Sequence, residues 1–248
     1  MTALATTTVF DDAQAEGLLE ADAQHWWFQA KGALVHDLID RFAPPGRIVD
    51  LGAGAGGVTA LLGGPVREVV AVEGAPALAR RCRERSLTAM TGSTAAVPLR
   101  DGCAAAVTLL DVIEHLPDPV ATLREAHRLL GPNGVVVVTV PAHQWLWSEA
   151  DEVLGHVKRY TRPMLQGELV EAGFSVPACT HAFSWLVPPV LVRRRMGGTR
   201  NTGPQLGLDA DSPTIRAAAS VLSRAERATT RKVALPVGTS VVAVGRAC

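Results

Sequence analysis

The feature that most constrains the fold of this chain is a short apolar run that ends in an acid and four glycines. Residues 47–57 read RIVDLGAGAGG. Glycine is needed in such a turn because a Cβ would block the turn or hold a ligand away from the backbone. An apolar strand followed by a carboxylate, a glycine turn and a helix predicts a nucleotide site at the carboxyl end of a parallel strand.

Two interpretations of this stretch are open when it is taken alone. Gly52, Gly54 and Gly57 match G-x-G-x-x-G, the fingerprint of dinucleotide-binding folds. Asp50 stands two residues before the first glycine and completes the pattern D-x-G-x-G-x-G. That pattern resembles the first motif of class I S-adenosylmethionine-dependent methyltransferases. The choice between the two therefore depends on the rest of the chain.

Composition bounds the class of protein. The chain has 248 residues, 48% hydrophobic and 19% charged, with a formal net charge of zero. This length suits one α/β domain with a full core or two small ones. A neutral chain has no overall basic surface, so we expect no nucleic-acid partner. The chain shows neither a signal peptide nor an apolar run near the ~20 residues that span a bilayer. We expect a cytoplasmic protein without an integral membrane segment.

The cysteines, at positions 82, 103, 179 and 248, are widely scattered. They form no C-x-x-C pair, and no histidine cluster has the spacing of a zinc site. We therefore expect reduced thiols and no bound metal.

Apolar runs and helical patterns alternate along the chain, which predicts an open, mostly parallel sheet. Two late strands, 174–182 and 238–246, predict an antiparallel hairpin at its end. Further strands are expected at 48–50, 66–73, 87–91, just before 111 and at 134–140. Helices are expected at 12–42, 58–62, from 76, at 119–130, 162–173 and 213–230, and a mobile loop at 197–212.

Four further motifs make the resemblance specific. Residues 92–103 read GSTAAVPLRDGC and residues 111–116 read DVIEHL, as in the small-molecule methyltransferase group that includes ubiquinone and sterol relatives. HWWF at 25–28 and GHVKRYT at 155–161 are similar to the signature of one subgroup. The resemblance implies a Rossmann-like class I fold: α/β, a seven-stranded mostly parallel sheet with a C-terminal antiparallel hairpin, and helices on both faces.

The resemblance also implies one domain over residues 1–248. Within it we expect an N-terminal lid or helical segment at 1–45, a cofactor-binding core at 46–140, and an acceptor-binding part with the hairpin at 141–248.

The cofactor implied by the resemblance is S-adenosyl-L-methionine. Asp50 would act at its methionine end, and an acid at Glu73 would accept two hydrogen bonds from the ribose hydroxyls. Ser93 stands where many members carry Asp beside the adenine. The other implied contacts are Gly52, Ala53, Gly54, Gly74, Thr94, Leu110 and Asp111.

The aromatic cluster near the N-terminus allows two interpretations. It can dock a helix onto the core, or it can form a lid with Trp26, Trp27 or Phe28 against the cofactor and Lys31 near a carboxylate. The lid alternative makes Trp27 a cofactor contact and Trp26 an acceptor contact.

Two places supply candidates for acceptor chemistry. The first is Glu114 and His115, which follow the fourth strand. The alternative to a catalytic role is that Glu114 caps the following segment and the His115 ring packs against the protein. The polar and aromatic region after the fifth strand is the other, and its alternative is an ordinary surface loop. The catalytic candidates are Glu114, His115, His143, His156 and Tyr160, and the acceptor-binding candidates are Trp26, Trp145, Trp147, Arg159 and Tyr160.

Two acceptor classes fit these residues. The first is a hydroxyl or carboxylate of a small molecule in secondary or lipid metabolism, with a histidine as base, and this O-methylation is slightly favoured. The second is an isoprenoid diphosphate methylated at an alkene carbon through a carbocation. That route needs aromatic faces, Glu114 or His115 as base, and a diphosphate site at Arg159, Arg162 or residues 193–195.

Other classes of function are less favoured. The intact Asp50, glycines and Glu73 argue against a catalytically idle subunit that binds S-adenosylmethionine or a partner protein, since a lost function need not keep them. A nucleic-acid methyltransferase would carry N/D-P-P-Y/F after the fourth strand, where this chain has DVIE. The apolar segment 185–192 fits packing on the sheet, a lipidic substrate or a membrane surface, and a homodimer is left open.

Overall fold

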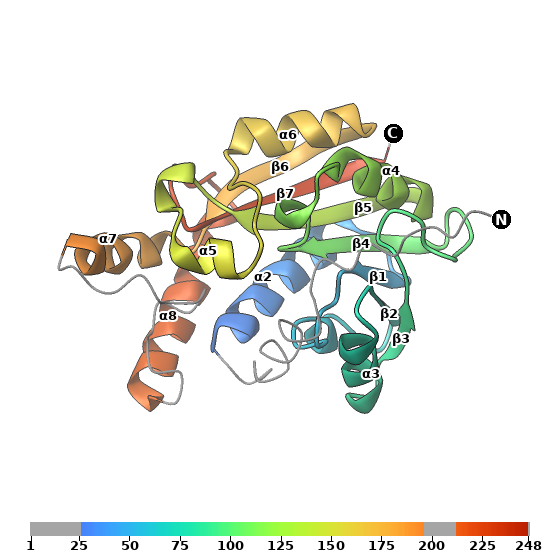
Figure 1. Cartoon of the computed structure of the whole chain (residues 1–248), viewed down its shortest axis with the longest axis horizontal. Helices are drawn as coiled ribbons and strands as arrows, with labels where there is room; N and C mark the ends of the chain where they lie inside the picture. The colour runs from blue at the N-terminus through green and yellow to red at the C-terminus, as the bar shows by residue number, and fades with distance from the viewer. Residues whose placement is uncertain (1–25, 196–211, 248) are drawn as a thin grey trace.

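The computed structural model describes residues 26–195 and 212–247, apart from the side chains of 193–195. At its centre is one seven-stranded sheet (Figure 1). In sheet order the strands are β3 (Thr88–Thr91), β2 (Val69–Glu73), β1 (Ile48–Leu51), β4 (Ala104–Leu110), β5 (Leu130–Pro141), β7 (Ser240–Ala247) and β6 (Phe174–Ala182).

The first five strands pair in parallel, whereas β7 runs antiparallel to both β5 and β6. The predicted mostly parallel sheet with two antiparallel strands at its end is therefore confirmed. The last strand of the chain fills the position between β5 and β6.

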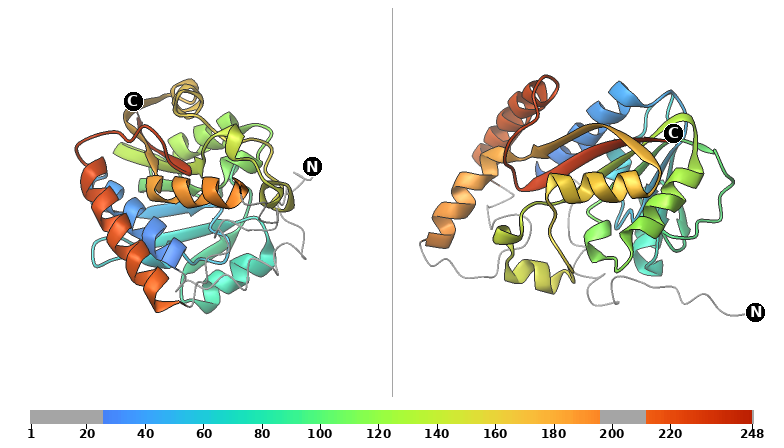
Figure 2. Two further views of the ribbon diagram at one scale, coloured as in Figure 1. Left: turned by 90° about the vertical axis from the view of Figure 1, so that its left-hand side faces the viewer. Right: turned by 90° about the horizontal axis from the view of Figure 1, so that it is seen from above.

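Helices cover both faces of the sheet (Figure 2). α2 (Trp26–Phe42) and α8 (Pro213–Thr230) share one apolar layer, and α4 (Pro119–Leu129) and α6 (Arg162–Glu171) share the other. Successive side chains of β5 point to opposite faces of the sheet. Val135 and Val137 therefore pack in the first layer, and Val136 and Val138 pack in the second. α3 (Pro76–Glu84) packs along β2 and β3.

Short elements join these layers at the carboxyl ends of the parallel strands. They are η1 (Thr59–Leu61), η2 (Ile113–His115), η3 (Gln144–Leu146), α5 (Glu149–Val153), η4 (Ser184–Leu186) and α7 (Val187–Arg195). The helix expected at 58–62 is only the single turn η1. Glycines at 56, 57, 63 and 64 leave too few residues between them for a helix to extend past its costly first turn.

In the described part of the N-terminal segment, α2 docks on the core through its aromatic residues, and contact of these residues with a cofactor or an acceptor stays a prediction. Helix α2 buries Trp26, Trp27, Val35 and Ile39 in the apolar layer beneath the sheet. The Trp27 ring lies 4.4 Å from that of Phe183, centre to centre. Residues 12–25 and, except for residue 212, the loop expected at 197–212 fall outside the described residues.

The apolar segment 185–192 forms η4 and the first part of α7. Leu186 and Val187 are buried in the protein, whereas Leu191 and Val192 are 41% and 56% exposed. Among the described residues, no helix combines the length and the apolar character that crossing a membrane would require.

Candidate functional site

Asp50, at the end of β1, is held by two threonines. Thr108 on β4 and Thr59 on η1 donate hydrogen bonds to its two carboxylate oxygens, at 2.5 and 2.6 Å. Burial raises the pKa of Asp50, and these bonds only partly oppose the rise. Asp50 thus joins β1, β4 and η1 from inside the protein, and its predicted action on the methionine end of a cofactor stays a prediction.

Three of the four glycines after Asp50, at positions 52, 54 and 56, are required for different reasons. All have positive φ, which L-residues with a side chain rarely adopt. A Cβ on Gly52 would lie 2.6 Å from Val112, and one on Gly56 would lie 2.7 Å from Leu87. A Cβ on Gly54 would meet nothing within 4 Å. Gly54 therefore borders open space, whereas Gly52 and Gly56 permit close packing.

Glu73, at the end of β2, fixes this loop from the opposite side. Its carboxylate accepts a hydrogen bond from the N–H of Gly54 and another from Ala75, both at 2.8 Å. The backbone N–H groups of Gly52 and Ala53 donate to the carbonyl of Val72, and Gly74 follows as a half-buried link to α3. The ends of β1 and β2 therefore form a cradle with an acid on one side and backbone on the other.

The turn after β3 extends the same edge. The N–H of Gly92 donates to the Glu73 carbonyl at 3.0 Å, which places Ser93 and Thr94 beside the acid strand. The Ser93 hydroxyl accepts from the N–H of Ala95, and the Thr94 and Thr122 hydroxyls lie 3.5 Å apart. Both side chains are half-buried.

Asp111, next to Leu110 at the end of β4, adopts a strained backbone with φ of 56°. Its carboxylate pairs with the ammonium of Lys31 on α2 and accepts a hydrogen bond from Thr139 at 2.8 Å. Burial raises the pKa of Asp111, but the charge and hydrogen bond of Lys31 outweigh it and the net pKa is lowered. The expectation that Lys31 lies near a carboxylate is thus confirmed, with Asp111 as the partner.

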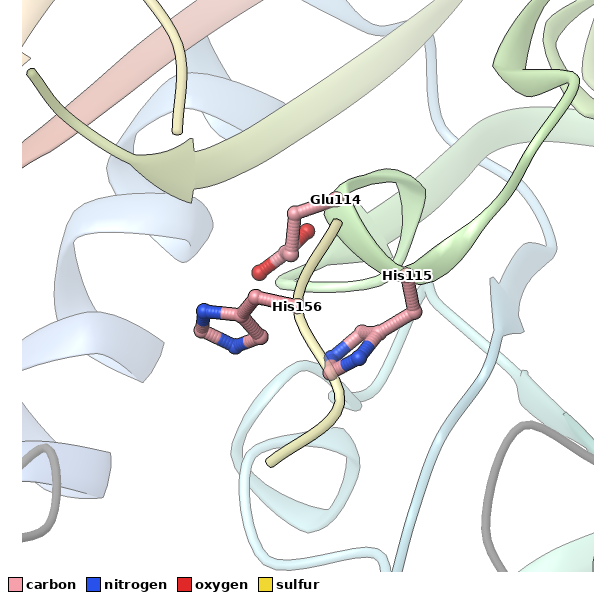
Figure 3. A group of neighbouring side chains, drawn as sticks. All are labelled: Glu114, His115 and His156. Atoms are coloured by element: carbon pink, nitrogen blue, oxygen red, sulfur yellow. The ribbon is translucent and has the colours of Figure 1, made fainter. Parts of the chain in front are cut away.

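Glu114, His115 and His156 come together beyond Asp111 (Figure 3). One nitrogen or oxygen atom from each lies within 4.8 Å of the others. Glu114 is fully buried, and neither carboxylate oxygen has a hydrogen-bond partner among the described residues. Burial and the charge of Asp111 raise the pKa of Glu114 well above its usual value, and burial lowers that of His115 to about 4.

His156 is backed by Asp151, an acid of the candidate region after the fifth strand, although the sequence did not predict that the two would pair. Its Nδ1 lies 2.8 Å from Asp151, which also accepts from the Ser148 N–H and from the Arg159 guanidinium at 2.7 and 2.9 Å. Asp151 therefore fixes the ring so that Nε2 points away from it. The signal available in the sequence was the capping pattern S-x-x-D at 148–151, five residues before a histidine.

The remaining candidates lie apart from this cluster. His143 stacks between Trp145 and His181, with ring centres 5.2 and 4.8 Å away. Burial lowers the pKa of His143. Trp145 is 50% exposed, and the Trp147 indole donates to Glu152 at 3.4 Å. The region after the fifth strand, which the sequence suggested as one candidate site, is therefore divided between these residues and the cluster that contains His156.

The side chains of Arg159 and Tyr160 are both hydrogen-bonded within the protein. Arg159 spans Asp151 with two nitrogens and donates a third bond to the carbonyl of Ala142 at 3.2 Å. The Tyr160 ring is fully buried, and its hydroxyl donates to Glu168 at 3.1 Å. These contacts indicate that both residues support the loop, and they favour this role over contact with a methyl acceptor.

This sheet order, with acids at the ends of β1, β2 and β4, defines the class I methyltransferase fold. The chain belongs to the methyltransferase domain family, whose sequence profile matches residues 21–178. It is similar to a probable S-adenosylmethionine-dependent methyltransferase of Mycobacterium tuberculosis, with 26% identity over 159 residues, 62% of this chain and 58% of the relative. The chain thus spans a little over half the length of that relative.

Two more similarities agree with the family. A ubiquinone biosynthesis O-methyltransferase of Xanthomonas campestris is 32% identical over 107 residues, 40% of this chain and 45% of the relative. The solved structure of geranyl diphosphate methyltransferase in complex with S-adenosylmethionine superposes with a TM-score of 0.56 and 16% identity. It covers 88% of this chain and 85% of the other, which shows the shared fold.

S-adenosylmethionine is the cofactor of this domain, and the residues present fit it. Gly54 leaves open the space that a side chain would fill, beside the Glu73 carboxylate and the backbone of the turn. Asp111 supplies a further carboxylate at the same edge of the sheet. The dinucleotide interpretation of the glycine turn is thereby discarded, whereas membership of the subgroup with HWWF and GHVKRYT stays a prediction.

Proposed function

We propose that this chain is an enzyme that transfers the methyl group of S-adenosylmethionine to an oxygen of a small-molecule acceptor. The observation that carries the proposal is the cluster of Glu114, His115 and His156 beyond the end of β4. These groups can accept a proton, and two of them lie on the turn η2 that follows β4, the central strand of the sheet. A methyl acceptor with a hydroxyl needs such a group.

His156 is the base that the geometry favours. The hydrogen bond between Nδ1 and Asp151 leaves Nε2 as the proton acceptor, and it stabilises the ring once the ring has taken the proton. Bound S-adenosylmethionine supplies a methyl group on a sulfonium, whose sulfur is an excellent leaving group. The chain therefore needs to position the acceptor, exclude water and remove one proton.

The cofactor contacts follow from the same edge. Glu73 is proposed to hold the ribose hydroxyls, the backbone at 52–54 the methionine end, and Ser93 and Thr94 the adenine. Asp111 is proposed to lie near the sulfur, where a carboxylate kept ionised by Lys31 favours positive charge.

Methylation of an alkene carbon is the second candidate, and one observation favours it. Glu114 is a buried carboxyl group with a raised pKa, suited to take a proton from a carbocation. Two observations weigh against it. Arg159 is bound to Asp151 and cannot hold a diphosphate without leaving it, and the Tyr160 ring lies inside the core.

The test is product identification with wild-type protein and two variants. Purified chain is incubated with S-adenosylmethionine and a panel of phenols, hydroxy acids, carboxylic acids and prenyl diphosphates, and products are identified by mass spectrometry. We expect an O-methyl product whose formation falls about 100- to 10,000-fold in His156→Gln. The control His36→Gln changes a histidine paired with Asp40 on the outer part of α2 and should keep full activity.

Three outcomes would count against the proposal. A carbon-methylated prenyl product that is lost in Glu114→Gln supports the second candidate. Equal O-methylation by His156→Gln and wild type removes His156 as base. Binding of S-adenosylmethionine with no transfer to any acceptor favours a non-catalytic subunit.

A further inference from the structure

Glu114 is a buried carboxylate with nothing in the described chain to satisfy it. It is 0% exposed, and both oxygens lack a hydrogen-bond partner among residues 26–195 and 212–247. Such a group is costly to bury unless it is hydrogen-bonded, paired or bound to a metal. Its oxygens are therefore suited to a partner that is not part of the polypeptide.

The side chains next to Glu114 are both imidazoles. One ligand atom each from Glu114, His115 and His156 lies within 4.8 Å of the other two. Figure 3 shows that Glu114 and His115 come from one turn and that His156 approaches from a separate segment. Two imidazole nitrogens and one carboxylate oxygen form the ligand set of catalytic zinc sites, in which a fourth position stays open. Magnesium and calcium prefer oxygen ligands alone.

The surroundings of His156 match those of a metal-bound histidine. Asp151 holds Nδ1 at 2.8 Å, and Arg159 and Ser148 hold Asp151 in turn. A ligating histidine usually donates its second ring nitrogen to a carboxylate in this manner, which fixes the ring and raises its basicity as a ligand.

We propose that Glu114, His115 and His156 bind a divalent transition-metal cation of the zinc type, and that the acceptor oxygen takes its open position. The second half of this inference rests on the proposed function, whereas binding of the cation does not. The bound cation makes the acceptor hydroxyl more acidic, and its proton leaves to solvent water. The oxygen then forms a bond to the methyl carbon while the carbon–sulfur bond breaks and its electron pair stays on sulfur. In the metal-loaded enzyme His156 is a ligand, and solvent water takes the proton that His156 accepts in the metal-free enzyme.

The test is metal binding by the full chain without an affinity tag. The protein is cleared with a chelator and titrated with Co²⁺, whose visible absorption reports nitrogen and oxygen ligands, and then with Zn²⁺ in competition. We expect one cation per chain, no visible band in Glu114→Gln or His156→Gln, and about 10- to 100-fold weaker binding in Asp151→Asn. His36→Gln should bind as wild type does. Circular dichroism checks that each variant is folded, and His115→Gln replaces any that is not.

The inference is overturned if wild type binds neither ion, or if Glu114→Gln binds as tightly as His36→Gln. Chelator-resistant O-methylation that still needs His156 would remove the cation and leave the proposed function intact. Cation binding that depends on all three residues, with no methyl transfer to oxygen, would remove the proposed function and leave the metal site.

Discussion

At the scale of single residues, the environments of the acids at the ends of β1 and β4 shift their pKa values in opposite directions. Burial raises the pKa of Asp50, whose only described side-chain partners are two neutral hydroxyls. For Asp111 burial acts in the same direction, but the positive charge of Lys31 outweighs it and lowers the pKa. Asp111 is therefore the acid better suited to face a cationic ligand, and Asp50 is the one better suited to hold strands together.

The first prediction concerns Gly54. Substitution Gly54→Ala places a methyl group in open space beside Glu73 and forces a side chain into a backbone with φ of 56°. We expect the strain to lower the free energy of unfolding by about 1 kcal/mol. Because the methyl group occupies the space assigned to the cofactor, we expect loss of S-adenosylmethionine binding in calorimetry.

The matched control is Gly167→Ala on α6, where an added Cβ also meets nothing within 4 Å but φ is not positive. Alanine is the better helix former, so this variant should be slightly more stable and should bind the cofactor normally. Wild-type affinity in Gly54→Ala would show that the cofactor does not approach this position.

At the scale of elements, the loop before β4 is attached to α4 by one arginine. Arg128 donates to the carbonyls of Val97 and Leu99 and to the carboxylate of Glu125. Burial raises the pKa of Glu125, but its hydrogen bonds from Arg128 and from the Val97 N–H outweigh burial, so the net pKa lies below its usual value. This ionised pair aligns the loop that connects the turn at Ser93 and Thr94 to β4.

We therefore predict a pH-dependent loss of stability in Glu125→Gln. A lowered folded pKa means that the stabilisation is fully present above the unfolded value of about 4.3 and is lost as pH falls through the folded value. Urea denaturation should show a deficit of about 1 kcal/mol at neutral pH that shrinks below about pH 4. Glu84→Gln, in an exposed pair with Arg81 on α3, should change stability by less than about 0.5 kcal/mol at either pH. An equal deficit at acid pH would exclude the ionic origin.

Elements were predictable from sequence where local signals sufficed. The bounds predicted for α8 and β6 agree with the structure, since proline opens the helix and the strand follows the glycine at 173. The packing partner of an aromatic side chain was not predictable. Trp27 contacts Phe183 only because segments more than 150 residues apart in the chain pack together. The meeting of Glu114 with His156 also depends on tertiary structure, as they lie on opposite sides of β5 in the chain.

At the scale of the whole molecule, the order of strands in the sheet differs from their order in the chain. Each strand from β2 to β5 pairs with a strand that is made before it, but β7 lies between β5 and β6. Six of its eight residues are buried, and β6 pairs with no other strand in the part of the chain that the structure describes. The sheet can therefore be completed only after residues 240–247 have been synthesised.

The final prediction follows from this closure. A chain that lacks residues 240–248 exposes the edge of β5 and leaves β6 unpaired, so both apolar layers lose the contribution of β7. We expect this variant to lose the cooperative thermal transition of the full chain and to aggregate when concentrated. Calorimetry and light scattering measure the two effects. Removal of residue 248 alone keeps β7 complete and should leave the transition unchanged. A cooperative transition in the shorter chain would mean that β1 to β5 with their helices fold as an independent unit, and that β7 adds stability without being required for the fold.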